Sequence, residues 1–192
     1  MEPAELGLQI AGINILLPGI CSLFLVPCSQ YIRFMKSASI AEIKQQLKEL
    51  PPAQLVEHCL QLARFKKDNK EFLTYLLFEA DDLQAYIKNV KEFIDESFTE
   101  INTSNLYYVK KTLRKILRIA NKHIRYTSSK TAEAEILMHY LTNFKGLKIP
   151  FHKSTALANL YAAQLKKVSA ALNTMHEDLQ YDYKRELQRL EI

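Results

Sequence analysis

Glycine is almost absent from most of this 192-residue chain, and its scarcity limits which folds and sites the chain can form. From Met35 to the last residue, 158 residues contain one glycine, Gly146, and three prolines, Pro51, Pro52 and Pro150. Loops that cradle a phosphate need several residues without a Cβ atom, so that backbone N–H groups can approach the phosphate. The tight turns of β-rich folds also need glycine. We therefore predict an all-α protein without a glycine-rich phosphate loop.

Composition changes sharply at residue 34. Residues 1–34 contain the other three glycines and only three charged residues, Glu2, Glu5 and Arg33. Residues 35–192 contain 25 basic and 19 acidic residues, which gives a net charge of +6. We therefore expect a single helical domain over 35–192, preceded by an apolar N-terminal extension over 1–34.

The extension includes an uncharged stretch over 6–28, and about 20 apolar residues are enough to span a bilayer. Pro18 interrupts this stretch, and no positively charged region precedes it, as a signal peptide requires. Three interpretations stay open: a tail or a start-site error with Met35 as the true start, a membrane anchor, or a signal peptide. The predicted domain has one cysteine, Cys59, which fits a reducing compartment. We expect a cytoplasmic protein, or a membrane-anchored one if 6–28 is an anchor.

Capping residues and apolar periodicity predict seven or eight helices in the domain. Ser39 and Glu42 have the spacing of a capping box at the start of the first helix. The run 72–78 is apolar almost all round, which predicts a helix at the centre of the fold. Gly146 is expected to end a helix as its C′ residue, and the last helix is expected to break near Asn173. The helices form either a bundle or a short irregular solenoid of the HEAT type.

The most specific feature is a basic helix predicted over about 106–126, which carries seven Lys and Arg and no acidic residue. At 100° per residue, the seven cations fall within an arc of about 140°, opposite the apolar residues. Such a row neutralises phosphates. We therefore predict a non-enzymatic interaction protein that binds a polyanion, with nucleic acid as the favoured ligand. The predicted binding residues are Tyr107, Lys110, Lys111, Arg114, Lys115, Arg118, Lys122 and Arg125.

The predicted basic helix is also compatible with roles that involve no nucleic acid. Its cations fit equally a solvated surface that is partly paired with the acidic face of the helix over 82–101, as in a plain scaffold. A row of cations also suits anionic lipid or an acidic protein.

The C-terminal region holds two further candidates. Apolar residues from Tyr161 to Leu179 recur at 3–4 spacing, and they pack either inside this chain or across a homodimer. Asp178 and Asp182 lie four residues apart on one helix face, which is the basis for an alternative function as a metal-dependent hydrolase. Carboxylates in this arrangement also form ordinary solvated acidic patches. The sequence assigns no catalytic residue, metal ligand or cofactor.

Five segments of the chain together carry a resemblance: 50–52, 73–80, 102–108, 149–154 and 176–183. They resemble an uncharacterised family of bacterial all-helical proteins, and the resemblance covers about 36–190. No activity is known for that family. The resemblance therefore implies a bacterial cytosolic protein that starts at Met35, and it assigns no functional residue.

Overall fold

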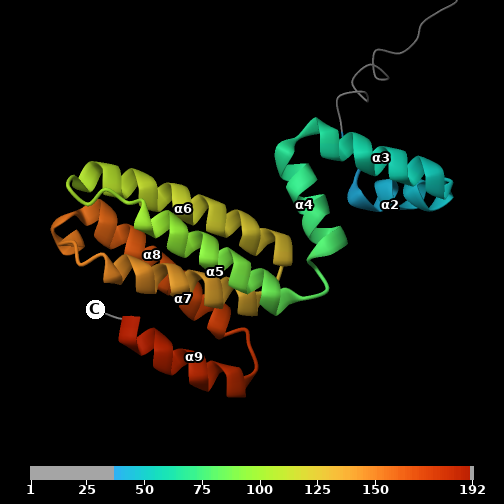
Figure 1. Cartoon of the computed structure of the whole chain (residues 1–192). Coiled ribbons are helices and arrows are strands. Elements are labelled where there is room, and N and C mark those ends of the chain that lie inside the picture. The colour runs from blue at the N-terminus through green and yellow to red at the C-terminus, as the bar shows by residue number, and fades with distance from the viewer. Residues whose placement is uncertain (1–36, 191–192) are drawn as a thin grey trace, which may run out of the picture. The chain divides into compact units, whose positions relative to one another are not determined.

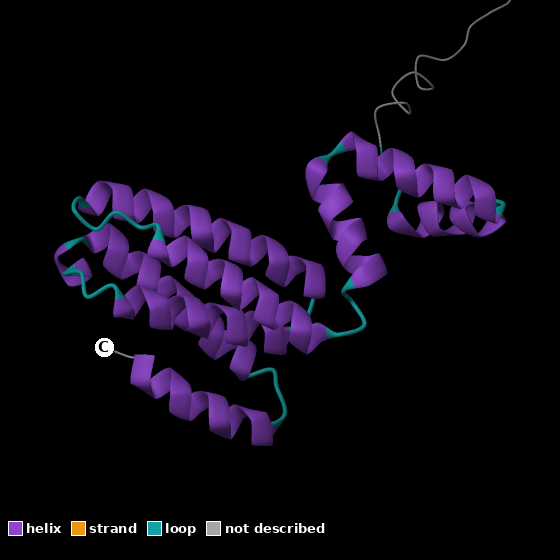
Figure 2. Cartoon of the chain, in the orientation of Figure 1, coloured by secondary structure: helices purple, strands orange, loops and turns teal. Residues whose placement is uncertain are grey.

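The computed structural model describes residues 37–190, which contain eight α-helices, one short 3-10 helix and no strand (Figures 1 and 2). The all-α prediction is therefore confirmed for this part of the chain. The extension over 1–34, with the stretch over 6–28, lies outside the described residues. The helices are α2 (Ile40–Glu49), α3 (Pro52–Phe65), α4 (Lys67–Phe78), α5 (Leu83–Thr99), α6 (Leu106–Thr127), α7 (Lys130–Gly146), η1 (Phe151–Lys153), α8 (Thr155–Leu172) and α9 (Glu177–Leu190).

The chain divides into two compact units, with the boundary between Leu55 and Val56, inside α3. This boundary differs from the change in composition at residue 34. In the first unit, α2 begins with the predicted capping box. The backbone N–H of Glu42 donates to the Ser39 hydroxyl at 3.3 Å, and the backbone N–H of Ser39 donates to the Glu42 carboxylate at 2.8 Å. These reciprocal bonds satisfy N–H groups that a helix start otherwise leaves unpaired.

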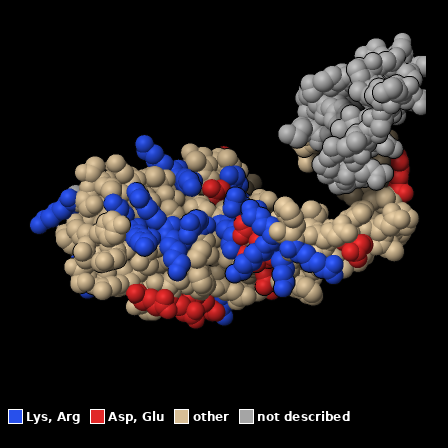
Figure 3. All heavy atoms as spheres, turned by 90° about the horizontal axis from the view of Figure 1, so that it is seen from above, with Lys and Arg blue, Asp and Glu red and all other residues tan. Residues whose placement is uncertain are grey.

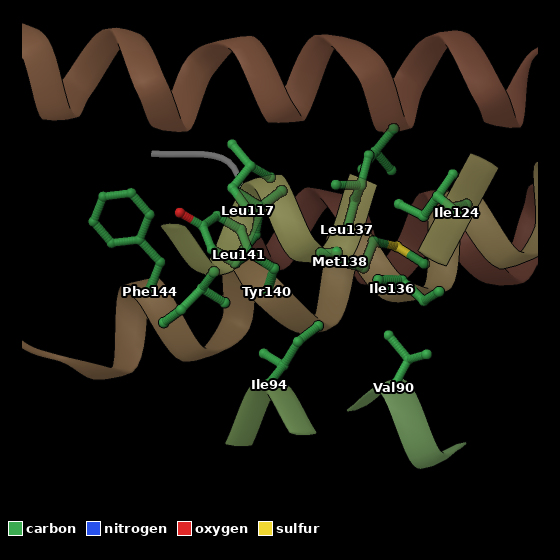
Figure 4. Packing of buried hydrophobic residues seen from close by; sticks show 14 of the residues in the cluster. Val90, Ile94, Leu117, Ile124, Ile136, Leu137, Met138, Tyr140, Leu141 and Phe144 are labelled. Atoms are coloured by element: carbon green, nitrogen blue, oxygen red, sulfur yellow. The ribbon is translucent and has the colours of Figure 1, made fainter. Parts of the chain in front are cut away.

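In the second unit, α7 is the central helix, because it packs against α5, α6, α8 and α9. Eight of its 17 residues are buried. Figure 4 shows side chains of three helices meeting in this core, among them Ile94 of α5, Leu117 of α6 and Leu141 of α7. The apolar face of α5 and the residue Ile101 after it are also buried here, through Tyr86, Ile87, Val90, Ile94, Phe98 and Ile101.

The apolar run over 72–78 lies in α4, and the prediction that it occupies the centre of the fold is wrong. Tyr75 is the one buried residue of α4, while Leu77 and Phe78 are 64% and 79% exposed. The apolar character of a helix shows that burial stabilises it, but it does not show which helix of the fold is surrounded by the others. That position belongs to α7. The Tyr75 ring packs α4 against α5 and α6: its centroid lies 4.6 Å from that of Tyr86 and 6.4 Å from that of Tyr126.

Two predicted helix ends have different outcomes. The break near Asn173 is confirmed, because Asn173 is the C-cap of α8 and α9 starts at Glu177. Gly146 ends α7, but the left-handed backbone lies two residues further on, at Lys148, where φ is 50°. A Cβ atom at Gly146 meets nothing within 4 Å, so neither space nor backbone conformation demands glycine there.

The apolar seam from Tyr161 to Leu179 lies mostly inside this chain. Tyr161, Val168 and Leu172 are fully or almost fully buried in the core of the second unit. Leu179 is the exposed end of the seam, at 44%. The side chains proposed for a homodimer seam are therefore used for packing within the chain, because α7 and α9 cover α8.

Candidate nucleic-acid interface

Helix α6 is anchored firmly by its apolar face. Its buried residues are Val109, Leu113, Ile116, Leu117, Ala120 and Ile124. The Tyr140 hydroxyl of α7 donates to the carbonyl of Leu113 at 3.1 Å inside the core. At the start of α6, the side chain of Asn105 accepts a hydrogen bond from the backbone N–H of Tyr107 at 2.8 Å. The helix is therefore a fixed support for the side chains on its other face.

The opposite face of α6 presents the predicted cations to solvent. Five of them are exposed, Lys110 is half-buried, and Lys122 is half-buried. Figure 3 shows Lys and Arg gathered over α6 on the face that it draws. The exposed five are Lys111, Arg114, Lys115, Arg118 and Arg125. Neither these five nor Lys110 form an ion pair with any carboxylate of residues 37–190.

Acidic residues of α5 do not pair with this row in the described part of the chain. Asp95 bonds instead to His139 at 2.6 Å and to Asn143 at 2.5 Å, both on α7. Glu96 and Glu100 line a hollow of about 210 Å³ together with Lys115, but at no point do they approach to ion-pair distance. The expected pairing with the helix over 82–101 is therefore not observed.

Lys122 is the exception in the row, because it pairs with Glu71 of α4. The two side chains are 22% and 30% exposed. The hydrogen bond from Lys122 lowers the pKa of Glu71, and the same bond raises the pKa of Lys122. The Tyr126 hydroxyl donates to the backbone carbonyl of Asp68 at 3.2 Å. Lys122 therefore holds α4 in place, which leaves six cations of the predicted seven without a carboxylate partner among residues 37–190.

Two aromatic side chains stand at the N-terminal end of the row. Tyr107 and Tyr108 are 63% and 56% exposed, and their rings meet edge to face with centroids 5.5 Å apart. The Lys110 ammonium lies 5.9 Å from the centroid of the Tyr107 ring, which is a cation–π contact. Beside them is a shallow groove of about 870 Å³, lined by Tyr107, Lys110, Lys111, Thr112, Arg114, Lys115 and Arg118.

The carboxylates of the alternative hydrolase site stand in solvent. The Asp178 side chain is 92% exposed, and its carboxylate lies 3.3 Å from His176, which is two residues away in the chain. Asp182 is exposed as well. Within residues 37–190, no three His, Cys, Asp or Glu side chains lie close enough together to hold a metal ion.

Sequence reasoning missed a cluster on the side of α6 that faces α4 and α5. The Tyr86 hydroxyl and His123 Nδ1 lie 2.7 Å apart, and the pKa of Tyr86 is raised, mainly by burial and then by Glu79. Burial first, and then the charge of Lys122, lower the pKa of His123. The partners are 37 to 58 residues apart in the chain, so no local pattern indicates the cluster.

Comparisons with protein-family models, with curated proteins and with solved structures gave no significant match to this chain. The fold and the geometry of the candidate site therefore carry the functional argument alone. No helix within residues 37–190 combines the length and the apolar character needed to cross a membrane.

Proposed function

We propose that the protein binds nucleic acid through the exposed basic face of α6. The observation that carries the proposal is a row of six cations, on one anchored helix, that have no carboxylate partner among residues 37–190. From Lys110 to Arg125 the row extends about 22 Å, at 1.5 Å per residue. This is about six nucleotide steps of one duplex strand, at 3.4 Å per step. The number of cations therefore matches the number of phosphates within reach.

The energetics of the row favour a ligand over a merely solvated surface. Arg114 lies four residues from Lys110 and from Arg118, and Lys115 lies four residues from Lys111. Like charges at this spacing destabilise a helix by a few tenths of a kcal/mol per pair. Folding alone gains nothing from this arrangement, whereas phosphate binding relieves this repulsion.

A lipid surface is a poorer ligand for α6 than nucleic acid. A helix that lies on a membrane inserts its apolar face among the lipid chains. In this protein, Val109 and Leu113 of that face are 0% exposed, and they pack in the core. The exposed aromatic pair, Tyr107 and Tyr108, offers ring faces on which nucleic-acid bases stack. The combination of cations and exposed rings supports nucleic acid rather than lipid.

The direct test is a binding titration of the full chain with fluorescently labelled RNA and DNA of about 20 nucleotides, single-stranded and duplex, at low salt. We expect saturable binding that weakens as salt rises. The triple variant R114E/K115E/R118E reverses three charges at the centre of the row, and we expect it to abolish binding. Undiminished binding by this variant, with its helical circular dichroism intact, contradicts the proposal.

A further inference from the structure

A second cavity lies on another side of α6, away from the free part of the basic row. It has a volume of about 400 Å³, and helices α4, α5 and α6 all contribute to its walls. Small-molecule sites in proteins typically have volumes of about 300–1,000 Å³. The cavity is therefore large enough for a small organic ligand, and nothing in the polyanion-binding proposal uses it.

The walls of this cavity are aromatic and apolar. Tyr86 and Phe93 of α5 and Tyr126 and Ile119 of α6 line it. The Tyr86 ring is fixed by the contact of its hydroxyl with His123 Nδ1, and the Tyr126 ring stacks on Phe72 with centroids 5.2 Å apart. Aromatic rings in a cavity wall attract organic cations where a ring face is accessible, and Phe93, which is 39% exposed, is the most accessible of the three rings.

The charged residues of the lining are Glu71, Glu79 and Lys122. Glu71 pairs with Lys122 and also, at 3.7 Å, with Lys67, which lies outside the lining. His123 is held toward its neutral form, because burial and the charge of Lys122 lower its pKa. Glu79 remains, and it forms no ion pair with another residue of 37–190. One unneutralised carboxylate thus stands at an aromatic cavity.

Glu79 lines the cavity at the C-terminal end of α4, close enough for its charge to act on the wall. Its charge is the second cause, after burial, of the raised pKa of Tyr86 in the cavity wall. Its backbone is also fixed, because the N–H of Glu79 closes α4 with a hydrogen bond to the Tyr75 carbonyl at 3.0 Å. An anionic ligand meets the unpaired carboxylate of Glu79 here, and the one lysine of the lining is already paired.

We propose that this cavity binds a small organic monocation, an amine with an aromatic or aliphatic body, whose ammonium group pairs with Glu79 and whose body lies against Phe93, Tyr86 and Tyr126. A carboxylate beside aromatic ring faces is the arrangement that recognises an ammonium group. The proposal is independent of nucleic-acid binding, because five of the six unpaired cations of α6 line a different groove and none of the six lines this cavity.

Three probes of nearly equal shape test the charge preference on the full chain. They are 2-phenylethylamine, which is a cation at pH 7, 2-phenylethanol, which is neutral, and 3-phenylpropanoate, which is an anion. Binding is followed by NMR through the ring signals of His123, which lies in the wall of the cavity. We expect the amine to bind about tenfold more tightly than the alcohol, the size of a favourable cation–π and charge contact. We expect no detectable binding of the anion.

Two variants separate recognition of the charge from recognition of the body. Glu79→Gln removes the carboxylate at an exposed position, so the fold is retained, and it should weaken amine binding about threefold without affecting the alcohol. Phe93→Ala should weaken binding of both. Glu186→Gln, at an exposed position of α9, is the matched control and should change nothing. Equal binding of amine and anion, an unchanged amine affinity in Glu79→Gln, or no binding of any probe each overturns the proposal.

Discussion

The salt dependence of nucleic-acid affinity tests the basic row quantitatively. Each phosphate contact releases condensed counterions, and the plot of log K against log salt concentration has a slope of about −0.9 per contact for duplex DNA. If all six unpaired cations of α6 contact phosphates, the slope is about −5.4. A rise from 50 to 200 mM salt then weakens binding by about 2,000-fold.

The variant R114Q/K115Q/R118Q removes three of the six cations and keeps good helix formers at these positions. Three contacts remain, so the slope falls to about −2.7, and the same rise in salt weakens binding by only about fortyfold. The slope is measured by fluorescence anisotropy with a labelled duplex at several salt concentrations. A slope is more informative than a single affinity, because it counts contacts rather than summing every contribution to binding.

A matched control separates local contacts from the effect of net charge. The variant K153Q/R185Q/R189Q also removes three exposed cations, but from η1 and α9. We expect its slope to equal that of the wild-type protein. If both triple variants reduce the slope equally, the general charge of the protein attracts the duplex. If neither does, the phosphates lie against another surface. Either result refutes the assignment of α6 as the interface.

Four further measurements test particular contacts. Tyr107→Ala should weaken the affinity for single-stranded nucleic acid by about 5- to 150-fold, because one base loses its stacking partner, while Tyr107→Phe should keep the wild-type affinity. An equal loss of affinity for a duplex contradicts stacking. Lys122→Gln should raise the pKa of His123 in an NMR titration, because it removes a nearby cation and leaves Glu71, whose charge favours the protonated ring, with Lys67 as its remaining ion-pair partner in the described chain. An unchanged or lower pKa contradicts the network. In the folded wild-type protein, the pKa of His123 lies below its usual 6.5, so the unfolded chain binds the proton more tightly. The free energy of unfolding should therefore fall as pH drops from about 7.5 to 5.5. Thermal melts of His123→Gln should show a smaller loss of stability over this pH range. Gln164 is 4% exposed, and its side-chain carbonyl has no hydrogen-bond partner in the described chain. Gln164→Met should therefore raise the free energy of unfolding, measured in urea, by about 1 kcal/mol. A decrease would show that the carbonyl is hydrogen-bonded in the native protein.

Features encoded by residues close together in sequence were predictable. The capping box at Ser39 and the break at Asn173 depend on a few neighbouring residues, and both are present. The division of α6 into a buried and a basic face follows from helical periodicity alone, and the structure buries the predicted apolar residues. These signals are local, because helix caps and helix faces are set within one or two turns of the chain.

Features that depend on distant contacts were not predictable. Glu71 and Lys122 are 51 residues apart, and neither has a neighbour in sequence that marks it for an ion pair. Helical periodicity therefore grouped Lys122 with the unpaired cations, although Lys122 forms an ion pair with Glu71 of α4. For the same reason it placed 72–78 at the centre, since an apolar run does not reveal that α7 fills that position.

The pairing of Lys122 also indicates where on α6 a ligand gains most. The aromatic pair and five of the six free cations lie in the half of the helix from Tyr107 to Arg118, and all of the basic groove lies there as well. Three pairs of like charges four residues apart lie in this half, where their repulsion costs folding free energy. Beyond it, Lys122 is occupied by α4, and Arg125 is the one remaining cation of the row. The helix thus separates its tasks along its length: the C-terminal half holds α4 to the bundle, and the N-terminal half concentrates a charge that binding a polyanion neutralises.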